Sequence, residues 1–215
     1  MKTQSKSRRS WLAGSLVMLA LAAAGEAAAE ASVAEARQVV ESLNASLLEL
    51  MKRADALGYA GRATTIEPVV RESYDLSSMA RIALGKHWRK LEADERERFV
   101  DLFARLTIAN YAGRFDGYAG ERFEVISEEA TSQGLRLVRS RIVRSNQEAI
   151  AIDYGLRPIG TEFRIVDIYL GGTVSELALR RAEYTSLIDR KGYSALVAAL
   201  EARIERLASG EDAGP

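Results

Sequence analysis

The chain has 215 residues, with 30 basic and 30 acidic side chains and no cysteine. That length is enough for one domain with a buried core, and the missing cysteines exclude disulfides, thiol catalysis and thiolate metal sites. The balanced charge lacks the basic excess that a nucleic-acid-binding surface needs, so we expect no nucleic-acid partner.

The first 29 residues follow the order of a secretory signal peptide. A basic cluster opens the chain, with Lys2, Lys6, Arg8 and Arg9. An uncharged apolar stretch covers residues 11–24, and Ala27-Ala28-Ala29 offers an A-x-A cleavage site. Because this stretch is shorter than the roughly 20 residues that span a bilayer, we expect a cleaved signal peptide at residues 1–29 and not a membrane anchor.

The export route stays open at this point. The sequence SRRSWL at residues 7–12 resembles a twin-arginine signal, with Trp11 where phenylalanine is usual, but the general secretion route also tolerates two arginines. Both routes end in the periplasm of a bacterium with two membranes, which is the location that we expect.

Removal of residues 1–29 takes away four basic residues and one acidic residue, so the remaining net charge is near −3. We expect one domain at residues 30–208 and a disordered tail at residues 209–215.

The first half of the domain has the pattern of amphipathic helices. From residue 32 to residue 118 apolar residues recur every three or four positions. Asp75 is predicted to cap a short helix that ends at Gly85. Pro68 is expected in the first turn of a helix, because proline has no N–H to donate in a later turn.

From Phe123 to Gly172 the apolar period changes to two, which is typical of strands. One predicted strand carries Ile150, Ile152, Tyr154 and Leu156 on a single face. The next strand carries Val166, Ile168 and Leu170 in the same way. Turn residues separate the successive strands, so an antiparallel meander of about four strands is predicted.

The helical period returns after the predicted sheet. Ser175 is a plausible cap for one helix, which Gly192 ends, and Ser194 is a plausible cap for the next. Helices, then a meander, then helices predict an α+β fold in which the helices pack over one concave face of a curved sheet.

No catalytic motif stands out in this sequence. His87 is the single histidine, and it cannot form a metal cluster by itself. Neither a G-x-S-x-G nucleophile elbow nor a glycine-rich phosphate loop is present. We therefore predict no cofactor and no metal ion, and we expect His87 at the surface or at a helix end.

Two aspartates leave an enzymatic alternative open. Asp153 and Asp167 lie in adjacent predicted strands, and paired carboxylates can act in general acid–base catalysis. The alternative is thus a small enzyme on a cone-shaped α+β fold that uses Asp153 or Asp167. Ion pairs are the favoured interpretation, and the nearby candidates for them are Arg139, Arg141 and Arg164.

Two stretches of the chain carry a family signature. The first runs Asp75-Leu76-Ser77-Ser78-Met79-Ala80-Arg81-Ile82-Ala83-Leu84-Gly85 and continues to Trp88, Arg96 and Phe99. The second runs Phe163-Arg164-Ile165-Val166-Asp167-Ile168, closes at Gly172, and continues to Arg181, Tyr184 and Gly192. Their order and spacing, from Val33 to about Leu207, resemble the MlaC (toluene-tolerance) family of periplasmic lipid carriers.

The chain departs from the family pattern after the last long strand. Gly171 stands where the family usually has an acidic residue, and Ser175 follows Gly172 by three residues and not by two. The segments Ser175-Glu176-Leu177-Ala178 and Arg180-Arg181-Ala182-Glu183-Tyr184 are more similar to HpnM, the branch that is associated with hopanoid lipids.

The resemblance implies a non-enzymatic, monomeric shuttle with an MlaC-like fold. Such a protein would take a lipid, either a hopanoid or a phospholipid, from an inner-membrane lipid transporter and deliver it to an outer-membrane acceptor complex. A scaffold of a hopanoid-synthesis complex, with no ligand and a filled core, is a further alternative. The residues expected to bind the lipid are the apolar ones of one helix and two strands: Phe103, Leu106, Tyr111, Ile150, Ile152, Tyr154, Leu156, Val166, Ile168 and Leu170.

We predict that the exported protein begins near Glu30 and is soluble, because an A-x-A site follows a short apolar stretch. N-terminal sequencing of the protein from a periplasmic extract checks this expectation. Recovery in the membrane fraction alone, with residues 1–29 retained, would contradict it.

Overall fold

The computed structural model describes residues 36–145 and 147–211. The predicted signal peptide, and most of the predicted tail, lie outside the described residues. Within the described part, no helix combines the length and the apolar content needed to cross a bilayer.

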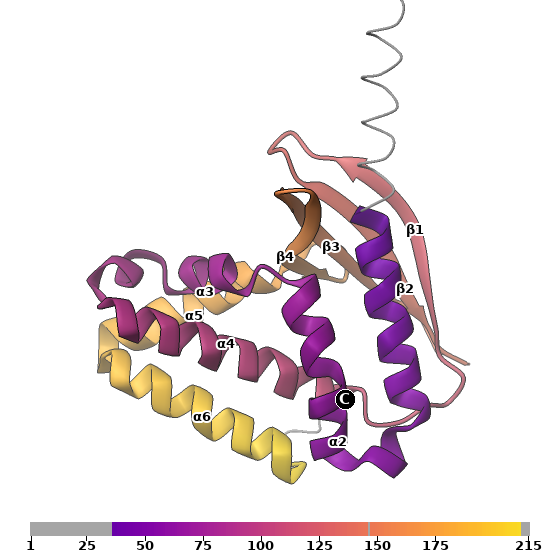
Figure 1. Ribbon diagram of the computed structural model, residues 1–215, viewed down its shortest axis with the longest axis horizontal. Helices are drawn as coiled ribbons and strands as arrows, with labels where there is room; N and C mark the ends of the chain where they lie inside the picture. Colours follow the sequence, from indigo (N-terminus) through magenta and orange to yellow (C-terminus); the bar gives the residue numbers. More distant parts are fainter. Residues whose placement is uncertain (1–35, 146, 212–215) are drawn as a thin grey trace, which may run out of the picture. The chain divides into compact units, whose positions relative to one another are not determined.

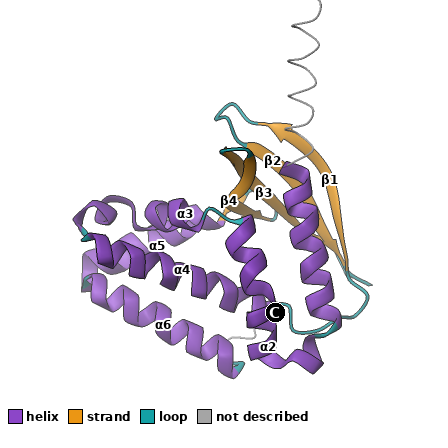
Figure 2. Ribbon diagram, viewed as in Figure 1, coloured by secondary structure: helices purple, strands orange, loops and turns teal. Residues whose placement is uncertain are grey.

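The helices form where the apolar period of three to four predicts them. A first helix covers residues 36–52 and buries Ala36, Val40, Leu43 and Leu47 completely. The other helices are α2 (Ala54–Ser73), α3 (Leu76–Leu84), the 3-10 helix η1 (Gly85–Lys90), α4 (Ala93–Arg114), α5 (Glu176–Lys191) and α6 (Tyr193–Ser209). Figures 1 and 2 show the helices gathered on one side of the sheet.

The sheet is an antiparallel meander in the order β1-β2-β3-β4-β5. Its strands are β1 (Arg122–Ala130), β2 (Arg136–Val143), β3 (Ile150–Ile159), β4 (Glu162–Leu170) and β5 (Val174–Ser175). The short β5 is additional to the predicted meander. It folds back on β4 because Gly171 and Gly172 adopt φ values of 61° and 75°, a region that glycine enters without steric cost. The α+β fold class is therefore confirmed.

Most of the predicted helix ends are confirmed. The carboxylate of Asp75 accepts a hydrogen bond from the backbone N–H of Ser78 at 3.1 Å, at the start of α3. The hydroxyl of Ser175 accepts one from Ala178 N–H at 2.9 Å, at the start of α5. Gly192 ends α5, but it also precedes the first residue of α6, so the prediction that Ser194 caps α6 is wrong.

The prediction for Pro68 is also wrong, because this proline lies inside α2 and not in its first turn. The chain bends earlier in α2, at Gly58, whose φ of 58° and ψ of 179° are not helical. A proline inside a helix removes one backbone hydrogen bond, and tertiary packing compensates for that loss here.

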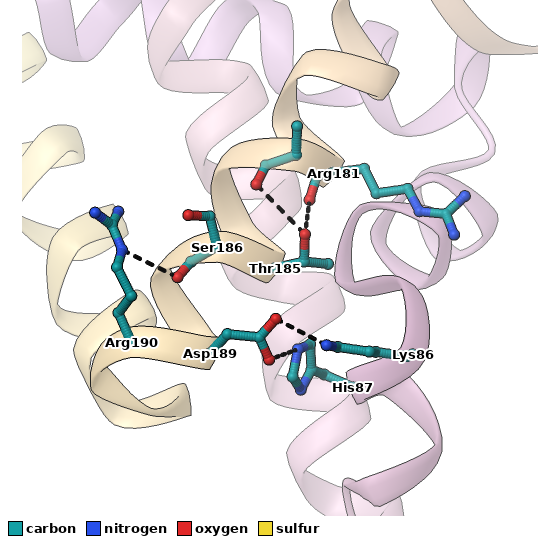
Figure 3. A network of polar contacts seen from close by, with 8 residues as sticks. Lys86, His87, Arg181, Thr185, Ser186, Asp189 and Arg190 are labelled. Atoms are coloured by element: carbon teal, nitrogen blue, oxygen red, sulfur yellow. Dashed lines mark hydrogen bonds and ion pairs between the residues drawn. The ribbon is translucent and has the colours of Figure 1, made fainter.

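His87 follows the end of α3, as expected, but its side chain is buried and only 6% exposed. Figure 3 shows it beside Asp189 of α5. The two side chains approach to 3.1 Å between Nε2 of His87 and Oδ1 of Asp189. Lys86 donates a hydrogen bond of 2.8 Å to the same carboxylate and holds the pKa of Asp189 below its ordinary value. His87 therefore helps to join η1 to α5.

Replacing His87 with alanine should lower the free energy of unfolding by about 1–3 kcal/mol, because a buried side chain leaves a cavity and Asp189 loses a neighbour. Chemical denaturation measures the loss. The matched control is Arg89→Ala, an exposed position in the same 3-10 helix, which should change stability by no more than about 0.5 kcal/mol. Equal stabilities for the two variants would show that His87 does not hold η1 in place.

Candidate functional site

Strand register gathers apolar side chains on the face of the sheet that meets the helices. Phe123 pairs with Ile142, which pairs in turn with Ile150. Farther along the strands, Ile152 pairs with Leu170 and Tyr154 with Ile168. Side chains two residues apart share a face of a strand. These residues therefore form successive apolar rows across the concave face.

The helices cover these rows unequally. At one end Val138, Tyr154, Leu156 and Ile165 are all at most 2% exposed and belong to the main core. Toward the other end Phe123, Val125, Ile152 and Leu170 are half-buried and Ile150 is 38% exposed, although Ile142 between Phe123 and Ile150 is buried. Ile168, the partner of Tyr154, is half-buried as well. The sheet thus carries apolar surface that its own helices leave partly uncovered.

Two aromatic side chains from the end of α4 border this uncovered region. The ring of Tyr111 stacks on that of Phe115, with 5.7 Å between centroids, and Phe115 lies 6.2 Å from Phe123 of β1. Tyr111 and Phe115, the residue that follows α4, are both half-buried. We call the combined surface the open end of the concave face, and its members are Tyr111, Phe115, Phe123, Val125, Ile150, Ile152, Ile168 and Leu170.

The structure divides the ten residues predicted to bind lipid. Five of them belong to the open end, namely Tyr111, Ile150, Ile152, Ile168 and Leu170. Four are buried in the packed core, namely Phe103, Leu106, Tyr154 and Leu156. Val166 is buried as well, but it lies outside the main core, at a register shift that pairs Leu156 with Ile165. Lipid contact by any of the ten stays a prediction.

Sequence reasoning missed Phe115, Phe123 and Val125. Phe115 follows Tyr111 by four residues and so continues the same face of the helix. Phe123 and Val125 alternate with polar residues at the strand period. The periodicity that identifies all three was therefore present in the sequence, at the end of α4 and at the start of β1.

A pair of tyrosine hydroxyls lies inside this apolar region. The hydroxyl groups of Tyr74 and Tyr111 share a short hydrogen bond, with the ring centroids 6.3 Å apart. Burial raises the pKa of Tyr74 and that of Tyr154, and it raises the pKa of Tyr111 to about 12. These hydroxyls therefore stay protonated at neutral pH and can act as uncharged hydrogen-bonding groups.

The two candidate catalytic aspartates have structural partners instead. Asp153 accepts a hydrogen bond of 3.2 Å from Ser140 N–H, at a gap in the β2–β3 ladder. Asp167 accepts hydrogen bonds from the Ser175 hydroxyl at 2.6 Å and from Leu177 N–H at 3.1 Å, where α5 begins.

The predicted ion pairs of these aspartates are wrong. The three arginines pair with glutamates instead: Arg139 with Glu129, Arg141 with Glu124, and Arg164 with Glu162. Glutamates on or next to the same strands are closer partners than the aspartates. Among residues 36–145 and 147–211, no three acidic or histidine side chains gather as metal ligands would.

Glu128 is a buried carboxylate that sequence reasoning missed. It lies on β1, with a side chain only 4% exposed, and its Oε1 is 3.8 Å from Nε of Arg136 on β2. Burial raises the pKa of Glu128, and the positive charge of Arg136 opposes that rise. The arginine neighbour makes this carboxylate part of an interstrand ion pair.

Two of the clefts on the surface of the described part lie along α2. One, of about 390 Å³, is lined by residues of α2, α3, β3 and β4, including Tyr74, Asp75 and Arg164. The other, of about 340 Å³, is a mainly apolar groove where the first helix meets α2, and it includes Leu50, Leu57 and Ile66. Neither cleft is lined by any of the ten residues predicted to bind lipid.

Comparisons with known proteins agree on the family and on the fold. The model of the family described as MlaC protein matches residues 24–202. A phospholipid-binding protein from Ralstonia solanacearum, solved in complex with a phospholipid, has a similar fold, with a TM-score of 0.71 and 20% identity. That match covers 81% of this chain and 99% of the other. A search among curated proteins found no match.

The tyrosine pair gives a test of how tightly the interior is organised. Tyr74→Phe should lower the free energy of unfolding by about 1–3 kcal/mol, because it leaves the Tyr111 hydroxyl without its partner. The double variant Tyr74→Phe with Tyr111→Phe should cost less than the two single losses together. Denaturant titration of the four proteins checks this. Strictly additive losses would show that the two hydroxyls do not depend on each other.

Proposed function

Because the chain belongs to the MlaC family, we propose that it is a lipid carrier and that it does not act as an enzyme. The apolar part of one lipid molecule lies against the open end of the concave face, between the sheet and the end of α4. No covalent bond is made or broken. Asp153 and Asp167, the residues on which an enzymatic function would depend, are engaged in hydrogen bonds that shape the fold.

The observation that carries this proposal is the apolar surface left partly uncovered inside the fold. A filled core would bury every apolar side chain of the concave face, whereas here Phe123, Ile152, Ile168 and Leu170 are only half-buried and Ile150 is exposed. Covering apolar area returns about 25 cal/mol per Å². A lipid tail seated there would therefore gain much of the free energy that it loses on leaving a bilayer.

The signal-like segment at residues 1–29 supports a compartment for this carrier, and the family supports its partners. We place the exported protein in the periplasm, as a monomer. An inner-membrane lipid transporter and an outer-membrane acceptor complex are its two exchange partners. A water-filled gap between two membranes is the barrier that such a carrier overcomes, because the apolar site shields the lipid from water.

Two lipid classes fit an apolar site of this kind. The segments Ser175–Ala178 and Arg180–Tyr184 favour the HpnM branch, and that branch implies a hopanoid. A phospholipid is the alternative, since the similar protein from Ralstonia solanacearum binds one. Native mass spectrometry and lipid extraction of the protein from a bacterial periplasm distinguish the two. Recovery without any lipid, under conditions that preserve a known lipid carrier, would contradict the carrier function.

Ile152→Trp tests whether the open end holds the lipid. The larger side chain should occupy the half-buried space, so the protein should stay folded and lose most of its co-purified lipid. The matched control is Ile126→Trp on β1, where the side chain is 57% exposed and lipid content should be unchanged. Melting temperature and lipid content are measured together.

The opposite result for Ile152→Trp identifies a packed core. Overpacking a filled interior costs about 1–3 kcal/mol of stability. A lowered melting temperature with lipid retained would therefore show that Ile152 is part of the core and not of the lipid site.

A further inference from the structure

Arg180 has an unusual position in the second turn of α5. It is half-buried, and its guanidinium carbon lies 5.4 Å from the centre of the buried ring of Phe103 on α4. Among the described residues, it is the one half-buried arginine for which the structure gives neither a hydrogen bond nor an ion pair. The half-buried arginines that have such partners are Arg37, Arg62, Arg96, Arg136, Arg144, Arg157 and Arg164.

Arg96 offers a direct comparison. It also lies over an aromatic ring, with its guanidinium carbon 5.8 Å from the centre of Trp88. In addition it donates hydrogen bonds to the backbone carbonyls of Trp88 and Arg89, at 3.2 Å and 3.4 Å. A ring contact uses the face of a guanidinium and leaves its N–H groups in the plane free. The guanidinium N–H groups of Arg180 are therefore all available to bind a ligand.

Arg180 lies on the side of α4 that leads toward the open end of the concave face, because Phe103 and Tyr111 are two turns apart on that side of the helix. Its positive charge acts on the hydroxyls of Tyr74 and Tyr111, where it counters part of the pKa rise that burial causes. Tyr111 itself borders the open end. A cation and two neutral hydroxyls therefore lie next to the partly uncovered apolar surface.

This combination suits one chemistry. A guanidinium presents paired N–H groups that match the oxygens of a phosphate or a carboxylate in a bidentate geometry. The aromatic ring on one side excludes water, and attraction between opposite charges is stronger where water is excluded. A neutral ligand offers no charged acceptor of this kind, so the N–H groups of Arg180 would pair with water instead.

We propose that Arg180 binds an anionic group, of the phosphate kind, on the lipid whose apolar part occupies the open end. This inference rests on the proposed lipid-carrier function and deepens it. Between the two lipid classes left open above, it favours the anionic phospholipids over the neutral hopanoids that the resemblance to the HpnM branch implies. Arg180 thereby becomes the residue that determines which lipid class the site accepts.

The experiment compares three probes on delipidated protein: dioleoyl phosphatidylglycerol, the matching dioleoylglycerol without phosphate, and a neutral hopanoid. Binding is measured by native mass spectrometry after titration from mixed micelles. For Arg180→Gln we expect the affinity for phosphatidylglycerol to fall by about tenfold or more, with the affinity for dioleoylglycerol unchanged. Arg180→Lys keeps the charge but not the planar fork, and it should give an intermediate loss.

The matched control is Arg190→Gln, an exposed arginine in the last turn of the same helix. It removes the same charge from α5 and should leave all three affinities unchanged. Melting curves of each variant verify folding. If Arg180→Gln does not fold, the comparison of Arg180→Lys with the unchanged protein decides.

The outcomes separate the inference from the function on which it rests. Equal losses for phosphatidylglycerol and dioleoylglycerol, or hopanoid binding as tight as that of phosphatidylglycerol, would overturn the role of Arg180 and leave the lipid carrier intact. Failure of the unchanged protein to bind any of the three lipids would overturn the function itself. Arg180-dependent binding of inorganic phosphate alone, with lipid binding unaffected, would show a free-anion site and would also overturn the inference.

Discussion

The fold depends on how far its helices cover the concave face of one curved sheet. Antiparallel strands with one apolar face must bury that face against another layer. Here Val138, Tyr154, Leu156 and Ile165 are buried in the core, whereas Phe123, Val125 and Ile152 pack against it and are only half-buried. A domain that packed both ends would be more stable and would have no space for a ligand. The incomplete coverage is therefore the feature on which the proposed binding function rests.

Polar groups within this framework serve distinct purposes. Asp153 and Asp167 bind backbone N–H groups where the regular hydrogen bonding of the sheet or of α5 is interrupted. Such groups cannot be left unpaired in the interior. Arg180 differs, because it approaches the interior without an acceptor among the described residues. Carboxylates in the sheet thus complete the fold, whereas the cation of α5 presents unused hydrogen-bonding capacity to a ligand.

The sequence was sufficient for features that depend on neighbouring residues alone. Asp75 and Ser175 cap helices within three residues of themselves, and the strand period identified the meander. Pro68 and His87 were predicted wrongly in part, because their surroundings come from segments distant in the chain. Periodicity also identified the apolar face of β3 without showing which end of that face the helices cover. Ile152 and Leu156 have the same pattern in the sequence and different burial in the structure.

The position of Arg180 also bears on how a carrier releases its ligand. A fully buried cation would bind a phosphate strongly but would be costly to leave unpaired in the empty protein. A half-buried guanidinium can be solvated when the site is empty, and it still gains from a phosphate when an apolar ligand excludes water. The cost of the unpaired guanidinium in the empty protein and its gain from a phosphate in the occupied protein are then both moderate. A shuttle needs this balance, because it must take a lipid from one membrane and surrender it at another.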